Sequence, residues 1–97
     1  MNAKKILLKA ARILEKSGWI RYEMERNGRY CMIGALRKAA FGSPYMPIQQ
    51  NQPHRSYHRA VRELADYGYC FGWNDEPDRR GKEVIAALRK TARKIKR

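Results

Sequence analysis

The chain has 97 residues, enough for one small domain, and we expect a single helical domain over residues 1–97 with a basic C-terminal helix. Hydrophobic residues make up 43% and charged residues 32%, a composition that excludes a disordered or a fibrous protein. The formal charge of +13 is concentrated at both ends, because residues 43–78 carry more acidic than basic side chains.

A first helix is predicted from about Ala3 to Ser17, because apolar residues recur there at helical spacing. These residues are Ile6, Leu7, Ala10, Ala11, Ile13 and Leu14. Gly18 fits a left-handed C-cap that lets Trp19 fold back on the last turn. The face roughly opposite the apolar one carries a row of basic residues at intervals of four, three and four: Lys5, Lys9, Arg12 and Lys16.

The dipeptide Asn27-Gly28 is typical of a type I′ turn, whose two central residues both need positive φ. Residues 21–26 before it and 29–30 after it predict a short hairpin. The next helix begins at about Cys31 and cuts the second arm short, so a bent loop is the alternative.

A second helix is predicted from Cys31 to Phe41, with Ile33, Leu36, Ala39 and Ala40 suited to burial. Gly42-Ser43-Pro44 ends it. The stretch from Ser43 to Gln52 is predicted to be a loop. Its ten residues are too many for the corner of a helix-turn-helix motif, which argues against that DNA-reading fold.

Two further helices are predicted, from about Pro53 to Tyr67 and from about Arg80 to Lys96. The first should bury Tyr57, Val61, Leu64 and Ala65, and the second Val84, Ile85, Leu88, Ala92 and Ile95. The segment between them is aromatic and then turn-like. The sequence therefore predicts a mainly α fold, a compact bundle of about four short helices with a short β-ribbon or bent loop around residues 20–30.

Several short motifs occur in a recognisable order: Gly18-Trp19, Gly28 before Cys31-Met32-Ile33-Gly34-Ala35-Leu36, Trp73-Asn74-Asp75 and Glu83-Val84-Ile85. In this order the chain resembles a family of small uncharacterised bacterial and phage proteins marked by Gly-Trp, Cys-x-x-Gly-Ala and Trp-Asn-Asp. The resemblance covers roughly Leu14 to Leu88. It implies a compact, mainly helical domain and no established activity.

The same motif residues also have structural interpretations. Cys31 at the start of an apolar helix suits a small buried hydrophobe. Gly34 and Ala35 allow another backbone to approach their helix closely. Asn74 and Asp75 suit a turn, where short polar side chains bond nearby backbone groups. The two Trp residues are large enough to hold the two ends of the core together.

The basic surface is the strongest functional signal, because Lys and Arg rows of one sign attract phosphate backbones. We expect a non-catalytic protein that binds DNA or RNA phosphates with little sequence specificity. The residues expected to make these contacts are Lys5, Lys9, Arg12, Lys16, Arg89, Lys90, Arg93, Lys94 and Arg97. The alternative is a phage-type or bacterial interaction module that binds an acidic host protein. An anionic membrane is a weaker candidate, because the last helix offers no Trp or Phe to insert.

Four aromatic residues alternate along one segment: Tyr67, Tyr69, Phe71 and Trp73. In an extended strand they would share one side and resemble a stacking platform for single-stranded bases. Core filling is the favoured interpretation for most of them, since a small domain needs its aromatic residues inside. Tyr45 and Tyr69 are the two tyrosines expected to be most exposed.

His54 and His58 are four residues apart, and with Cys31 and Cys70 they would supply four zinc ligands. The cysteines are not paired locally, so half-buried surface histidines and no metal are expected. An arrangement of Cys31, a histidine and Asn74 would resemble a thiol hydrolase. The apolar neighbours of Cys31 predict an inert thiol, so we expect no enzyme and no cofactor.

The third helix carries two basic-first i,i+4 pairs, Arg59–Glu63 and Arg62–Asp66, which predict a solvated, self-neutralised face. A cytoplasmic location is expected. No apolar run is long enough to cross a bilayer, and the first apolar run breaks at Lys9, too early for a secretion signal. The two cysteines are accordingly expected as free thiols.

Overall fold

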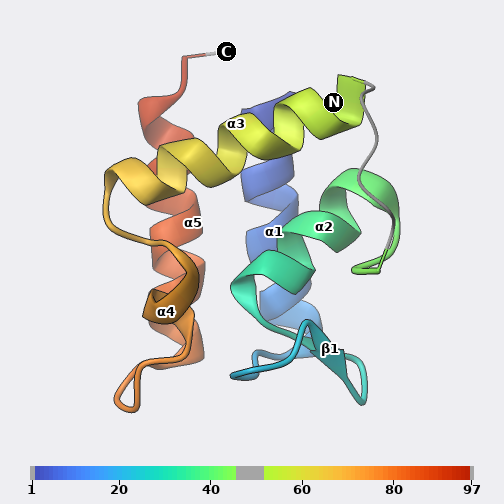
Figure 1. Cartoon of the computed structure of the whole chain (residues 1–97), viewed down its shortest axis with the longest axis vertical. Helices are drawn as coiled ribbons and strands as arrows, with labels where there is room; N and C mark the ends of the chain where they lie inside the picture. Colours follow the sequence, from blue (N-terminus) through green and yellow to red (C-terminus); the bar gives the residue numbers. More distant parts are fainter. Residues whose placement is uncertain (1, 46–51, 97) are drawn as a thin grey trace.

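The computed structural model describes residues 2–45 and 52–96, and these residues form five helices and one two-stranded hairpin (Figure 1). The helices are α1 (Ala3–Ser17), α2 (Met32–Phe41), α3 (Gln52–Asp66), α4 (Phe71–Asn74) and α5 (Gly81–Lys94), and the strands are β1 (Glu25–Arg26) and β2 (Arg29–Tyr30). The mainly α fold with a short ribbon is confirmed. The short α4 was not predicted, and most of the predicted loop over 43–52 lies outside the described residues.

Helices α1 and α5 run side by side in opposite directions, and α3 crosses them (Figure 1). The most extensive helix contacts are those of α1 with α5 and with α2, so α1 is the central element of the bundle. Its largest fully buried side chains, Ile6 and Leu7, share one core with Leu36, Leu64 and Leu88. None of the described helices is both long and apolar enough to cross a membrane.

Six residues predicted for burial lie partly or wholly outside the core: Ala65 is exposed, and Ile13, Ile33, Ala40, Val61 and Ile85 are only partly buried against it. Ala65 is exposed, because α3 crosses α1 obliquely and makes its buried contacts through Tyr57, Ala60 and Leu64 instead. Ile13 and Ile85 are only partly buried and line surface grooves beside α1 and α5. Apolar periodicity locates the centre of each buried face but not its edges.

The hairpin has the predicted turn. Asn27 (φ +53°) and Gly28 (φ +79°) both have positive φ, and Arg26 pairs with Arg29 in the antiparallel register. Gly18 departs from the predicted left-handed cap, since its φ of +105° is combined with a ψ of 161°. The reason is that the chain leaves α1 extended and pairs with β2. The N–H of Tyr30 donates to the carbonyl of Gly18 at 3.1 Å.

The predicted close approach at Gly34 is confirmed. A Cβ added there would lie 1.9 Å from the backbone oxygen of Met24, so only glycine fits at this position of α2. The backbone just before β1 thus lies directly against α2.

Asn74 at the end of α4 is buried, with 4% of its surface exposed, and bonds distant segments rather than the nearby backbone that was predicted. Its side-chain oxygen accepts from the indole N–H of Trp19 at 2.7 Å and from the N–H of Met32 at 3.0 Å. Its amide donates to the carbonyl of Ile20 at 3.4 Å and to the carboxylate of Asp75 at 2.9 Å. These five residues, the Asn74 cluster, join α4 to the start of α2 and to the segment after α1.

Candidate nucleic-acid interface

The basic row of α1 lies on the helix surface that faces away from the core. Its members are all exposed: Lys5, Lys9, Arg12 and Lys16. Among the residues that the structure describes, none of the four forms an ion pair. They border an open groove of about 480 Å³, to which Leu8 and Ile13 contribute an apolar lining. Leu8 is 38% exposed, so hydrocarbon surface lies among four cations.

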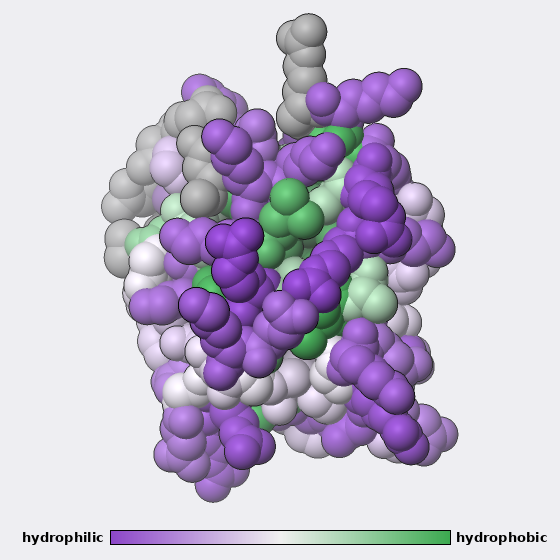
Figure 2. All heavy atoms as spheres, turned by 180° about the vertical axis from the view of Figure 1, so that it is seen from behind, coloured by the Kyte–Doolittle hydropathy of each residue, from purple (hydrophilic) through white to green (hydrophobic). Residues whose placement is uncertain are grey.

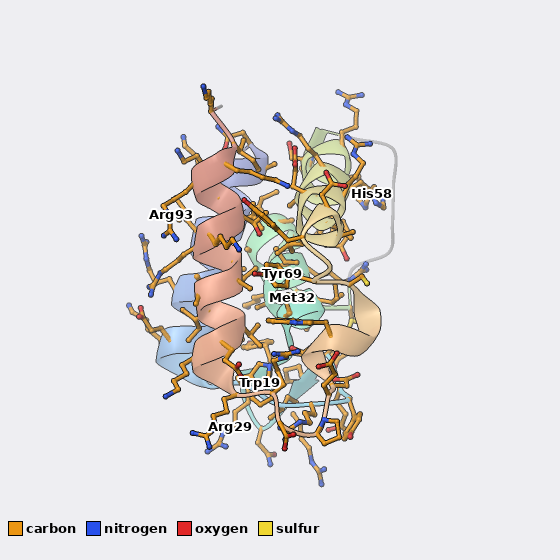
Figure 3. All side chains as sticks on the ribbon, turned by 90° about the vertical axis from the view of Figure 1, so that its left-hand side faces the viewer. Trp19, Arg29, Met32, His58, Tyr69 and Arg93 are labelled. Carbon is orange, nitrogen blue, oxygen red and sulfur yellow. The ribbon has the colours of Figure 1, made fainter. Side chains whose placement is uncertain are left out.

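An ion pair joins this helix to α5, where the guanidinium of Arg89 lies 2.9 Å from the carboxylate of Glu15. A second open groove of about 460 Å³ follows the seam between the two helices. Glu15 on α1 and Lys82, Ile85, Ala86, Arg89 and Arg93 on α5 line it. The side chain of Arg93 points toward the α1 side of the molecule (Figure 3).

The two helices together present one surface, which we call the basic face. It consists of Lys5, Lys9, Arg12, Lys16, Lys82, Arg89 and Arg93. Seen from the α1 side, long hydrophilic side chains surround a smaller apolar patch (Figure 2). Among the residues that line the two grooves, Glu15 is the acidic one, and it lines the groove along the seam. The hydrogen bond and charge of Arg89 lower the pKa of Glu15, and the charge of Arg12 adds to the effect, so this carboxylate stays ionised.

Two of the predicted contact residues on α5 lie on the other side of that helix. The ammonium groups of Lys90 and Lys94 lie 4.5 and 4.2 Å from the ring centre of Tyr67. Lys94 also lies 3.1 Å from the carboxylate of Glu63 and donates to the Glu63 backbone oxygen at 3.0 Å. Its charge is therefore engaged within the protein. Arg97, also predicted, lies outside the described residues.

Lys82 on the basic face was not among the predicted contact residues. It lies seven residues before Arg89, a spacing of two helical turns that places both side chains on one side of α5. This spacing is the sequence signal from which Lys82 could have been predicted.

The exposed face of α3 is only partly paired as predicted. The Arg59–Glu63 pair is present at 3.8 Å. The predicted Arg62–Asp66 pair is wrong, because Asp66 instead lies 3.9 Å from the ammonium of Lys94 on α5. The packing of α3 against α5 brings this competing cation close.

The aromatic segment is not extended. Gly68 (φ +88°) turns the chain after α3, and α4 follows, so the extended strand that a stacking platform of four alternating residues would need does not form. Tyr67, Tyr69 and Trp73 form a row with ring centres 5.7 and 4.6 Å apart. Tyr69 and Trp73 pack against the core, which confirms core filling for Trp73 and corrects the expected exposure of Tyr69. Tyr45 is exposed as predicted, at 61%, whereas Tyr69 is half-buried.

The cysteines and histidines do not form a common site. Within residues 2–45 and 52–96, no group of three or more His, Cys, Asp or Glu side chains is placed to hold a metal ion. His54 is 3% exposed and stacks on Phe41 at 4.3 Å, so it is buried rather than half-exposed, while His58 is exposed. Burial raises the pKa of the Cys31 thiol, and the Cys31 sulfur accepts from the N–H of Gly34 at the N-terminus of α2.

Comparison with known proteins agrees with the motif analysis. A family model, described as a family of unknown function (DUF6197), matches residues 1–94. The chain belongs to this DUF6197 family. The match confirms the resemblance to an uncharacterised family and covers more than the 14–88 expected from the motifs, including both basic helices α1 and α5. No curated protein and no solved structure matches the chain.

Proposed function

We propose that this protein binds the phosphate backbone of nucleic acids through the basic face, acts by binding and not by catalysis, and discriminates little between base sequences. The antiparallel packing of α1 and α5 is the observation that supports this most. It brings two basic rows from opposite ends of the chain onto one surface, and among the described residues that line its two grooves the one carboxylate, Glu15, is paired with Arg89. Cations without partners in the protein gain affinity for phosphates largely by releasing counterions, and such contacts carry little base information.

The experiment is a salt titration by fluorescence anisotropy, with labelled duplex DNA and labelled single-stranded RNA of two unrelated sequences each. Between about 0.05 and 0.2 M salt we expect affinity to fall by orders of magnitude, with similar values for the two sequences. The slope of log K against log salt gives the number of phosphates contacted. Absence of binding at micromolar protein would contradict the proposal.

A second candidate function is favoured by the exposed Leu8. Hydrocarbon surface among cations fits an acidic protein partner that also presents an apolar side chain, as a phage-type or bacterial interaction module would need. The substitution Leu8→Ser separates the two functions, because it keeps every charge of the basic face. It should weaken capture of an acidic partner and leave nucleic-acid affinity unchanged.

The same proposal places the protein in the cytoplasm, where nucleic acid is available and thiols stay reduced. Cys31 and Cys70 are both free, as that compartment favours. Cell fractionation of the tagged full chain tests this, and recovery in the membrane fraction would contradict it.

A further inference from the structure

A third open groove, which we call the aromatic groove, lies on the side of α5 next to the α1–α5 seam. Its volume is about 450 Å³, within the range of roughly 300–1,000 Å³ typical of small-molecule pockets. Its lining residues are Tyr69, Trp73, Arg79, Glu83, Ala86, Ala87, Lys90 and Arg93. Two rings and two small alanines thus lie beside three cations, and Tyr69 lies between α5 and the α3–α4 segment (Figure 3).

The ring at one end of the groove is fixed in place before any ligand binds. The guanidinium of Arg79 lies 3.9 Å from the ring centre of Trp73 and donates to the Trp73 backbone oxygen at 2.9 Å. Arg79 is itself paired with Glu76 at 2.6 Å and with Glu83 at 3.5 Å. Tyr69 packs against the same indole at 4.6 Å. An aromatic surface that is already ordered loses little conformational freedom when a flat ligand stacks on it.

The aromatic groove is continuous with the basic face through shared residues. Ala86 and Arg93 line both the seam groove and the aromatic groove, so they form the ridge between the two. A strand whose phosphates lie along the basic face therefore passes the open side of the aromatic groove at Arg93.

We propose that the aromatic groove accepts an unstacked base of single-stranded nucleic acid. The inference rests on the proposed phosphate binding and adds a preference for single strands over duplex. Every base has an apolar face that stacks on tyrosine, tryptophan or arginine, whatever the sequence. Lys90 and Arg93 are placed to contact the phosphates on either side of that base. Duplex bases remain stacked on one another and cannot enter.

The test compares four labelled probes of equal length by anisotropy: single-stranded DNA, single-stranded RNA, duplex DNA and a single strand in which most nucleotides are abasic. The abasic strand keeps the phosphates and lacks the rings. We expect both base-containing single strands to bind about fivefold or more tighter than the abasic strand. The ratio of the RNA and DNA affinities shows which strand the groove prefers.

Two variants test whether the tighter binding of base-containing strands arises in the aromatic groove. Tyr69→Leu keeps apolar bulk and removes a ring, and Ala86→Leu fills the groove from an exposed position of α5. Both should bring the affinity for base-containing strands close to that for the abasic strand. In Tyr69→Leu the abasic binding itself should stay nearly unchanged, because Tyr69 lines the aromatic groove and not the seam groove. Tyr45→Leu is the matched control, because Tyr45 is exposed and outside the groove. Helical circular dichroism verifies the fold of each variant.

Different experimental results would overturn the two proposals. Equal affinities for the abasic and the base-containing strands would overturn the base-binding groove and leave phosphate binding intact. An unchanged base preference in a folded Ala86→Leu variant would also overturn it. No binding of any of the four probes would overturn both proposals.

Discussion

The indole N–H of Trp19 and the side-chain oxygen of Asn74 form a 2.7 Å hydrogen bond between positions 55 residues apart. The same oxygen accepts from the N–H of Met32. One buried oxygen therefore satisfies donors from two segments, and the amide group of the same side chain donates to the carbonyl of Ile20, the residue after Trp19. This arrangement gives the Gly-Trp and Trp-Asn-Asp motifs a structural role, since each supplies one side of the contact.

We expect Asn74→Ala to lower the free energy of unfolding by about 3 kcal/mol. The substitution leaves the buried donors of Trp19 and Met32 without an acceptor, and each such group costs roughly 1–3 kcal/mol. Urea denaturation followed by circular dichroism measures the loss. Asn2→Ala, which removes only the N-cap of α1, is the control and should cost about 1 kcal/mol. Equal losses in the two variants would contradict the role of the Asn74 cluster.

Gly34→Ala should destabilise the protein by about 2 kcal/mol, a melting temperature roughly 10 °C lower. The added methyl group would overlap the backbone oxygen of Met24, which cannot move without displacing the segment that leads into β1. Gly72→Ala in α4 is the matched control, because nothing lies within 4 Å of its added Cβ. A differential scan in which both variants melt like the wild type would show that the hairpin segment is free to shift away from α2.

Neutralising the basic face should weaken nucleic-acid binding more than neutralising other cations. In Lys9→Gln/Arg93→Gln we expect affinity for duplex DNA to fall about tenfold and the salt slope to fall by roughly 2. Neither residue forms an ion pair among the described residues, so the fold should not change. Arg26→Gln/Arg62→Gln changes the net charge equally at other surfaces. Identical losses in both pairs would assign the binding to net charge alone.

The lowered pKa of Glu15 predicts a pH-dependent contribution to stability. Arg89 favours the ionised carboxylate in the folded chain, so the contribution is present above the ordinary value of 4.5 and is lost as the pH falls through the lower folded value. Glu15→Gln should therefore be less stable than the wild type at pH 6 and equally stable at pH 2. A carboxyl NMR titration should also show the Glu15 midpoint rising in Arg89→Gln. No movement of that midpoint would contradict the ion pair.

The two thiols should differ in reactivity. Burial raises the pKa of Cys31 and shields its sulfur, whereas Cys70 is exposed. With limiting iodoacetamide at pH 8, mass spectrometry should find Cys70 modified several-fold faster. Cys70→Ser should abolish the fast reaction. Rapid modification of Cys31 in that variant would instead indicate an accessible, activated thiol and reopen a catalytic role.

Local features of the sequence predicted most of the secondary structure. Apolar spacing located α1, α2, α3 and α5 within about two residues at each end, and Asn27-Gly28 located the hairpin turn. These features succeed because helix periodicity and positive φ depend on neighbours in the chain. The short α4 was missed, since its central contact is between Asn74 and a tryptophan 55 residues away.

Most individual residues of the basic face were predicted from the sequence, but the surface that they form together was not. Periodicity showed which side chains share a face of α1 or of α5, and it could not show that the two helices lie side by side. Only the packing reveals that Arg89 meets Glu15 while Lys94 turns toward Glu63. The packing of α5 against α1 likewise shows that Lys82 lines the groove along the seam.

The Asn74 cluster and the basic face have no residue in common. The cluster is centred on the buried Asn74 and unites α4, the start of α2 and the segment after α1, while the cations lie on the outer surfaces of α1 and α5. Exposed substitutions away from such buried contacts change stability by only about 0.5 kcal/mol. Affinity for a polyanion can consequently be tuned, abolished or redirected to another partner on this scaffold with little effect on folding. The bundle is therefore a suitable framework for engineering or evolving new surface specificities.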